Sequence, residues 1–273
     1  MRQFYVNSGM SLADKVIWIT GASSGIGAAT ALELSKQKTE LILSARTLEK
    51  LEEVQALCTA NGATCHVLAI DLSKTDTHLA IAEEAWKLAG RIDVLFNNAG
   101  ISQRELALET DLEVDRRVME VNFFGTVSLS KAVAPMMLKA GGGHIALNTS
   151  IVGKIGFPLR TAYAASKHAL HGFFDSWRAE LDGQNLDITL ICPGRTNTPI
   201  SLSALRGDGS THGEVDDWMK NGMTAESVAK RIVKAIRRKE KEVYIGSKES
   251  LLVYIRRYFP PLYYRIVTRV KAQ

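Results

Sequence analysis

The chain has 273 residues, of which 46% are hydrophobic and 23% are charged. This composition supplies a sizeable core and excludes a disordered or fibrous chain, and the length suits one large α/β domain or two small ones. The net charge of +5 equals the contribution of residues 248–273, where six Lys or Arg oppose one Glu (6 − 1 = +5), so the neutral remainder excludes an extended nucleic-acid surface.

Short apolar runs alternate with helical patterns from residue 15 to residue 246. Buried strands are predicted at 15–20, 40–45, 64–70, 92–96, 144–150, 186–192 and 241–245. Helices are predicted at 28–37, 47–60, 75–89, 111–139, 161–181 and 224–238. This alternation predicts a doubly wound, seven-stranded parallel sheet with helices on both faces. Without a linker or repeat, residues 1–246 are predicted to form one domain, followed by a tail at 247–273.

The first predicted strand leads into a glycine-rich turn, T-G-A-S-S-G-I-G, and then into a helix. The turn departs from the dinucleotide fingerprint G-x-G-x-x-G, but it has the same logic, because backbone N–H groups at a helix N-terminus bind phosphate. Other suggestive residues also follow predicted strands. They are Ala45-Arg46, Asp71, Asn98–Gly100, Ser150 and Pro193-Gly194. All of them are expected at the carboxyl edge of the sheet, where such folds bind ligands.

The second predicted strand ends in Ala45 and Arg46, without a carboxylate. An acidic residue there would bind the ribose 2′-hydroxyl of NAD, whereas a guanidinium pairs with a 2′-phosphate. NADP(H) is therefore predicted over NAD(H). The alternative is a solvated Arg at a strand end.

Ser150, Tyr163 and Lys167 form the candidate catalytic group. A Tyr and a Lys four residues apart share a helix face, and a nearby ammonium lowers the phenol pKa from about 10. With Ser150 holding a carbonyl oxygen, this trio suits interconversion of a carbonyl and an alcohol, which requires a nicotinamide cofactor. A second Y-x-x-x-K, at Tyr244 and Lys248, begins in a predicted strand, where this spacing does not bring the side chains together.

Together, T-G-A-S-S-G-I-G, N-N-A-G, Ser150, Y-A-A-S-K and P-G resemble the short-chain dehydrogenase/reductase family over residues 15–246. The resemblance implies a Rossmann fold. It implies that Tyr163 is the general acid, that Ser150 orients the carbonyl, and that Lys167 holds the nicotinamide ribose and lowers the Tyr163 pKa. It adds Asn122 as a fourth catalytic position, which supports a water joining the active-site Lys to solvent.

The resemblance also implies the cofactor contacts. Gly21, Ser23, Ser24, Gly25, Ile26 and Gly27 would hold the pyrophosphate, Asp71 and Leu72 the adenine, Asn98, Ala99 and Gly100 the adenosine ribose, and Pro193, Gly194 and Thr198 the nicotinamide carboxamide. Tyr163 and Lys167 are also expected among the cofactor-binding residues. Thr196 departs from the family pattern, which has an aliphatic residue there. The resemblance further implies a dimer or tetramer assembled through the helices at 111–139 and 161–181.

Residues 199–223 form a long connection, and such connections are usually functional or disordered. The family has a substrate-covering flap at this position. An apolar pocket is expected from Leu202, Leu205, Trp218, Met219 and Met223, with Ile155 and Phe157 opposite. It suggests a lipophilic carbonyl or alcohol as substrate.

The tail at 247–273 is basic and amphipathic. Leu251, Ile255, Tyr258, Phe259 and Leu262 share one helical stripe, Arg256 and Arg257 another, and Pro260-Pro261 is expected to break the helix. Two interpretations remain open: a membrane-surface anchor, or a tail packed on its own domain or across a dimer. A third, nucleic-acid binding, is disfavoured because the rest of the chain has no basic bias that would extend the patch. The tail and Y-A-A-S-K-H-A-L-H-G-F-F-D resemble the membrane-associated branch with corticosteroid-type hydroxysteroid dehydrogenases and their dehydrogenase/reductase relatives.

Targeting and metal signals are weak. The first fourteen residues lack the apolar core of a signal peptide, and no run approaches a membrane span, so a cytoplasmic location is expected, with a membrane surface as the alternative. Cys58, Cys65 and Cys192 are expected to be reduced core thiols, and the six histidines form no ligand pair, so no metal is expected.

The sequence therefore predicts an NADP(H)-dependent oxidoreductase acting on a lipophilic ketone, aldehyde or alcohol. Two rivals are a catalytically silent nucleotide-binding regulator and a membrane-surface scaffold that works through the tail. Asn122, Ser150, Tyr163 and Lys167 argue against the regulator, because a pure binder needs no Ser150.

Overall fold

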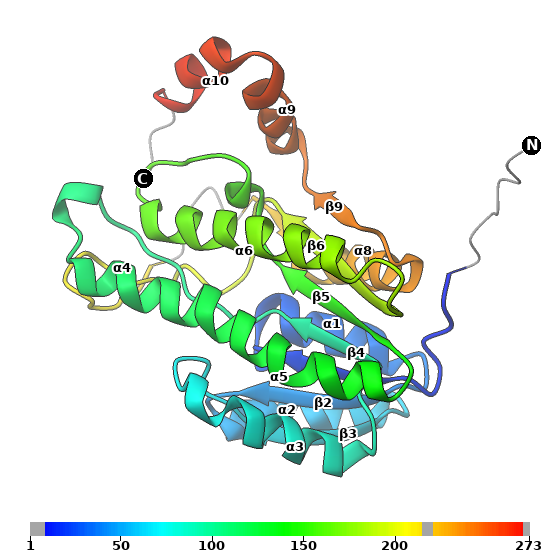
Figure 1. The fold of residues 1–273 in the computed structure, drawn as a ribbon. Coiled ribbons are helices and arrows are strands. Elements are labelled where there is room, and N and C mark those ends of the chain that lie inside the picture. The colour runs from blue at the N-terminus through cyan, green and yellow to red at the C-terminus, as the bar shows by residue number, and fades with distance from the viewer. Residues whose placement is uncertain (1–8, 215–220, 270–273) are drawn as a thin grey trace, which may run out of the picture.

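The computed structural model describes residues 9–214 and 221–269. Within them, seven parallel strands form one sheet in the order β3-β2-β1-β4-β5-β6-β9 (Figure 1). The strands are β1 Val16–Thr20, β2 Glu40–Ala45, β3 Thr64–Ala69, β4 Val94–Asn97, β5 Gly143–Asn148, β6 Leu186–Pro193 and β9 Glu242–Ile245. A two-stranded parallel pair, β7 Thr196–Asn197 and β8 Met223–Thr224, lies apart from this sheet.

Helices cover both faces of the sheet, as predicted for a doubly wound fold. One face carries α1 Gly25–Ser35, α2 Leu48–Ala60 and α8 Ala225–Arg238. The other carries α3 His78–Ala89, α5 Gly125–Lys139 and α6 Thr161–Glu180, with α4 Leu112–Met119 leading into α5 (Figure 1). Short 3-10 turns lie at η1 Thr75–Thr77, η2 Ala107–Glu109, η4 Ile151–Gly153 and η5 Lys248–Ser250.

The central strand β1 shows why the strands are continuous apolar runs. All five of its residues are buried. Ile17 and Ile19 pack on the side of α1 and α8, whereas Val16 and Trp18 pack on the side of α3 and α5. A parallel strand with helices on both faces has no solvent-facing side. Each side chain is therefore apolar, or its polar atoms have hydrogen-bond partners inside the protein. The Trp18 indole N–H, for example, donates to Ser44 Oγ at 2.8 Å.

The predicted helix at 111–139 is not uniform. A π-helical turn, η3 Glu120–Phe124, separates α4 from α5. Such turns insert one extra residue into a helix and often occur at functional sites. Here the turn contains Asn122, whose side chain is fully buried.

The tail forms two short helices, α9 Leu251–Tyr258 and α10 Pro260–Val267, which arch beyond the sheet edge (Figure 1). The predicted break at Pro260-Pro261 is confirmed, since α9 ends at Tyr258. Of the predicted stripe, Ile255 packs against the cluster of Ile151, Ile155 and Tyr263, and its other members are exposed. Among the tail residues that the structure describes, Tyr263 alone is buried, at 2% exposure, whereas Tyr258 and Phe259 are 70% and 63% exposed.

No helix in the described ranges combines the length and apolarity needed to cross a bilayer. Cys58 and Cys192 are buried free thiols as expected, while Cys65 is only half-buried.

Candidate active site

The glycine-rich turn closes tightly on the end of β4. Gly21 has a φ of +64°, a conformation that favours glycine. A Cβ on Gly27 would lie 2.1 Å from the Gly21 carbonyl oxygen and 2.5 Å from Asn98 Nδ2. The Asn98 amide in turn donates to the carbonyls of Thr20 and Gly21, each at 3.1 Å. Only glycine therefore lets this turn lie against Asn98.

The turn delivers the N-terminus of α1 to the sheet edge. Ser24 occupies the N-cap position, and its side chain makes no capping hydrogen bond among the described residues. The first N–H groups of a helix have no intrahelical partner, so this end is suited to a phosphate. The close-packed glycines and the uncapped helix end fit a dinucleotide pyrophosphate.

A cavity of about 640 Å³ opens at this edge. Of the predicted cofactor residues, those that line it are Gly21, Ser23, Ser24, Gly25, Ile26, Ala45, Arg46, Asp71, Leu72, Asn98, Ala99, Gly100 and Thr198. Those that do not are Gly27, Tyr163, Lys167, Pro193 and Gly194. Gly27 instead packs against the Gly21 carbonyl and the Asn98 side chain.

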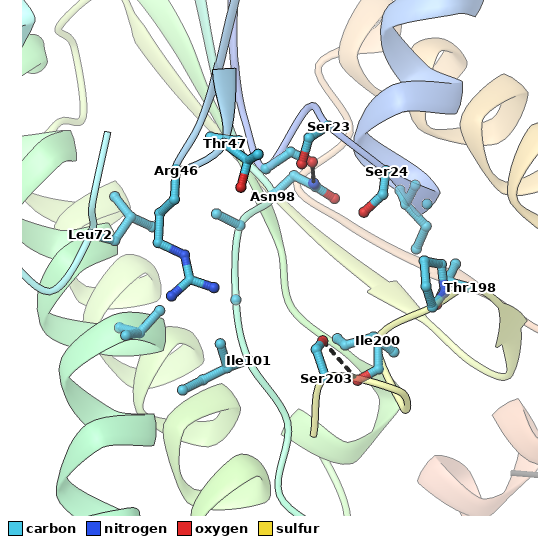
Figure 2. Close-up of a pocket in the computed structure, with 18 of the residues that line it drawn as sticks. Ser23, Ser24, Arg46, Thr47, Leu72, Asn98, Ile101, Thr198, Ile200 and Ser203 are labelled. Atoms are coloured by element: carbon cyan, nitrogen blue, oxygen red, sulfur yellow. Dashed lines mark hydrogen bonds between the residues drawn. The ribbon is translucent and has the colours of Figure 1, made fainter. Parts of the chain in front are cut away.

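Sequence reasoning missed several lining residues. Thr47 and Lys50 extend the Arg46 side of the cavity, and Figure 2 shows the Arg46 guanidinium projecting into it. Lys50 lies one helical turn after Thr47, so its position beside Arg46 follows once α2 is known to begin at Leu48. Arg117 and Asn148 also line the cavity without having been expected.

The Asp71 carboxylate is held by its own loop. Its Oδ1 accepts hydrogen bonds from the Ser73 backbone N–H at 3.0 Å and from Ser73 Oγ at 2.8 Å. Burial raises the pKa of Asp71, but these hydrogen bonds outweigh it, so the pKa is held below its usual range. The group is an anion fixed at the end of β3.

Ser150, Tyr163 and Lys167 come together as predicted. Ser150 caps η4 and accepts a hydrogen bond from the Val152 N–H at 3.1 Å. Its hydroxyl also interacts with the Tyr163 phenol. Lys167 Nζ lies 5.7 Å from the centroid of the Tyr163 ring and donates to the Asn148 carbonyl at 2.8 Å.

The expectation that Lys167 lowers the Tyr163 pKa is wrong for this structure. Burial raises the pKa of Tyr163, against smaller opposing effects from Arg160, Ser150 and Arg104, and Lys167 is not among the causes. Burial also lowers the pKa of Lys167 to about 8. Lys167 donates its hydrogen bond to the Asn148 carbonyl, and burial is the dominant influence on the Tyr163 phenol.

Asn122 connects this group to the end of β4. Its Nδ2 donates to Ser166 Oγ at 3.0 Å and to the Ile101 carbonyl at 2.9 Å, while its Oδ1 accepts from the Ile101 N–H at 2.8 Å. A Cβ on Gly100 would lie 3.0 Å from Asn122 Oδ1 and 3.6 Å from Lys167 Nζ. The π-helical turn thus places the Asn122 side chain against the Ile101 backbone, close to Gly100 and Lys167.

The flap only partly matches its expected pocket. Leu202 and Leu205 line the cavity, and Leu205 exchanges backbone hydrogen bonds with Ser102 and Arg104. Met223 instead packs against the hydrophobic core because it lies in β8, directly before α8. Ile155 packs against Tyr263, and the Arg160 guanidinium lies over the Phe157 ring at 5.9 Å. Trp218 and Met219 lie outside the described residues.

A doubly wound sheet with a glycine-rich phosphate turn and a Ser-Tyr-Lys group defines a dinucleotide-binding oxidoreductase of the short-chain type. The family model for short chain dehydrogenase matches residues 15–207. The chain is 41% identical over 266 residues to a Xenopus tropicalis protein named "Dehydrogenase/reductase SDR family member 7B", covering 95% of this chain and 86% of that one. A Drosophila melanogaster "Dehydrogenase/reductase SDR family protein 7-like" is 38% identical over 263 residues, covering 94% and 81%. The chain therefore belongs to the short-chain dehydrogenase/reductase family.

Solved structures share the fold. A short chain dehydrogenase/reductase from Burkholderia phymatum, in complex with NAD, has a TM-score of 0.82 at 24% identity and covers 93% of this chain and 96% of its own. An alcohol dehydrogenase from Thermococcus sibiricus, complexed with 5-hydroxy-NADP, has a TM-score of 0.74 at 24% identity and covers 86% and 97%.

Behind Ser150, the loop that follows it is fastened to β9. Lys154 Nζ lies 2.7 Å from Glu242 Oε2, and His171 Nδ1 lies 3.5 Å from the same oxygen. Tyr244 donates its hydroxyl hydrogen to Glu242 Oε1. Burial raises the pKa of Glu242, but the contacts with His171, Lys154 and Tyr244 outweigh it and lower the pKa to about 2. His171, Asp175 and Glu242 lie close enough to suggest a cation site, but the Lys154 ammonium already balances this carboxylate.

Glu242→Gln is expected to lower the free energy of unfolding by on the order of 2 kcal/mol at neutral pH, with allowance for solvent screening. The folded-state pKa lies below the unfolded value, so this contribution is complete above about pH 5 and is lost as pH falls toward 2. Urea unfolding should therefore show a wild-type advantage that shrinks on acidification. Glu113→Gln is the control, because its ion pair with Arg116 is exposed. A constant difference between wild type and Glu242→Gln from pH 7 to pH 3 would contradict this account.

Proposed function

We propose that this protein is an NADP(H)-dependent oxidoreductase that interconverts a lipophilic ketone or aldehyde with its alcohol. The observation that carries the proposal is the lining of one cavity by a phosphate turn, by Arg46 with Lys50, and by apolar flap residues. It adjoins the Ser150, Tyr163 and Lys167 group through Asn148, which lines the cavity and accepts the Lys167 hydrogen bond.

The catalytic roles follow from the chemistry of each group. A bound nicotinamide supplies or accepts the hydride. Ser150 holds the carbonyl oxygen by a hydrogen bond, and Tyr163, with its phenol kept protonated by burial, donates a proton to that oxygen during reduction. Lys167, with a pKa of about 8, exchanges protons near neutral pH and is placed to replenish the site. In oxidation the same groups act in reverse.

The nucleotide preference rests on this chain's own residues. Arg46 and Lys50 place two cations on the cavity wall after β2, and Thr47 adds a hydroxyl. Figure 2 shows Arg46 and Thr47 on this wall. No carboxylate stands at Ala45 or Arg46 to bind a ribose 2′-hydroxyl. The guanidinium favours a 2′-phosphate because it can bind two phosphate oxygens at once.

The substrate class follows from the flap side. The flap residues Ile200, Leu202 and Leu205 line the cavity, together with Ile101 and Val121 from outside the flap. Figure 2 labels Ile101 and Ile200 among them. Such a wall favours a substrate with an extended apolar part, because burying apolar surface contributes roughly 25 cal/mol per Å². We also propose a homo-oligomer that buries the exposed aromatic Phe124 with the faces of α5 and α6.

Arg46→Asp tests the nucleotide preference. Fluorescence titration should show NADPH binding weakened by about a hundredfold, since two charge-assisted hydrogen bonds are lost and a repulsion is added. NADH binding should change little or improve. Arg116→Asp makes the same charge change at an exposed position of α4 and should bind NADPH as wild type does. Unchanged NADPH affinity in Arg46→Asp would refute the preference.

A further inference from the structure

The outer surface of the tail carries large apolar and aromatic side chains that do not pack on the domain. Six large side chains within residues 251–264 are about half exposed or more: Leu251 58%, Tyr254 51%, Tyr258 70%, Phe259 63%, Leu262 47% and Tyr264 55%. In α9, Leu251, Tyr254 and Tyr258 follow one helix face, and Phe259 continues it at the kink. Monomeric soluble proteins rarely expose such a contiguous patch without a binding role.

The same segment is strongly cationic. Residues 247–269 contain five cations, Lys248, Arg256, Arg257, Arg265 and Arg269, against the single Glu249, a net charge of 5 − 1 = +4. Glu249 is turned inward, with a side-chain exposure of 14%, and lies 3.7 Å from the Arg195 guanidinium. The described outer surface of the tail therefore presents apolar and cationic groups together, without a carboxylate.

The tail is nevertheless firmly held on the catalytic domain. Tyr263 packs against Ile151 and Ile155 and donates its hydroxyl hydrogen to the Gly156 carbonyl at 2.5 Å. Glu249 Oε1 accepts a hydrogen bond from the Arg195 N–H at 3.2 Å. These contacts reach the loop after Ser150 and the loop after Pro193. The exposed apolar and cationic groups therefore lie on a segment that is packed against the domain.

We propose that the outer face of residues 248–269 docks on an anionic lipid bilayer. Aromatic side chains favour the membrane interface, and each cation near an anionic leaflet adds to the attraction. A second copy of this chain fits less well, because a symmetric contact would bring five cations against five. If the proposed function holds, docking also brings the loops after Ser150 and Pro193, which the tail contacts, close to the bilayer in which lipophilic substrates dissolve.

The test is sedimentation of the full-length protein with phosphatidylcholine vesicles, with and without phosphatidylserine. The wild type should sediment with the phosphatidylserine vesicles, less so at high salt, and weakly with phosphatidylcholine alone. A triple variant, Tyr258→Ser, Phe259→Ser and Leu262→Ser, should partition at least about tenfold more weakly. Arg257→Glu with Arg265→Glu should lose the dependence on phosphatidylserine.

The matched control carries Leu57→Ser, Leu79→Ser and Leu108→Ser, three changes at exposed leucines elsewhere. It should sediment as the wild type does. NADPH titration in solution checks that every variant is folded and separates a failure of docking from a failure of the proposed enzyme. Docking is overturned if the wild type stays in the supernatant, or if the tail and control variants partition alike. It is also overturned if light scattering shows that the tail triple variant changes subunit number while vesicle binding persists.

Discussion

Tyr163→Phe is expected to lower kcat for NADPH-dependent carbonyl reduction by about 10³-fold, within the range that general acid catalysis contributes. The variant keeps the ring and removes only the hydroxyl that interacts with Ser150. Because Tyr163 does not line the nucleotide cavity, NADPH affinity should stay close to that of the wild type. Single-turnover measurements with a panel of lipophilic ketones would separate the chemical step from binding.

Tyr244→Phe is the control for this experiment, because Tyr244 and Lys248 repeat the Y-x-x-x-K spacing. Tyr244 lies in β9 with its hydroxyl on Glu242. Because this Y-x-x-x-K begins in a strand and not in a helix, Tyr244 is expected to have no catalytic role. The kcat of Tyr244→Phe should therefore remain close to that of the wild type. Equal losses in the two variants would show that the phenol of Tyr163 has no special role in proton transfer.

Gly27→Ala is expected to have the second large effect, on both nucleotide binding and stability. The added Cβ would lie 2.1 Å from the Gly21 carbonyl oxygen, and backbone there is fixed by Asn98. Relieving such a contact shifts the turn, at a cost of about 3 kcal/mol. The melting temperature should fall by roughly 6–12 °C, and NADPH binding should be lost, because the N–H groups of the turn no longer converge.

Gly172→Ala provides the comparison for Gly27→Ala. Gly172 lies in α6, where an added Cβ would meet no atom within 4 Å. Alanine there should leave nucleotide binding unchanged and raise the free energy of unfolding by up to about 1 kcal/mol, since alanine favours helix. Calorimetry and NADPH titration on both variants give the test. A Gly27→Ala protein with wild-type melting and affinity would mean that the turn is not close-packed in solution.

Sequence patterns predicted the sheet well because each signal is local and physical. Strands such as β1 are continuous apolar runs since both of their faces are covered, and glycines mark the turn that meets α1. The convergence of Gly21, Asn98 and Ser150 follows from a rule for all parallel sheets, that carboxyl ends share an edge. The family resemblance rests on these same residues.

Other features depend on contacts between segments distant in sequence. Nothing local marks the π-helical turn at Asn122, because it is stabilised by backbone groups of Ile101, 21 residues away. Met223 was expected in the substrate pocket, but its place directly before α8 points it into the core. The pKa of Tyr163 was expected to be low from the nearby Lys167, whereas burial, which only the packed site determines, raises it.

In the tail, the features determined by the sequence and those determined by the tertiary structure can be told apart most clearly. By itself, the sequence determined that residues 247–273 are basic, amphipathic and broken at Pro260-Pro261, because composition and proline geometry are properties of the chain alone. Tertiary structure decided which side chains of the tail pack against the domain. Tyr263 turns inward to Ile151, Ile155 and Gly156, and Phe259 and Leu262 are left at the surface, because the loop after Ser150 accepts one side chain from α10.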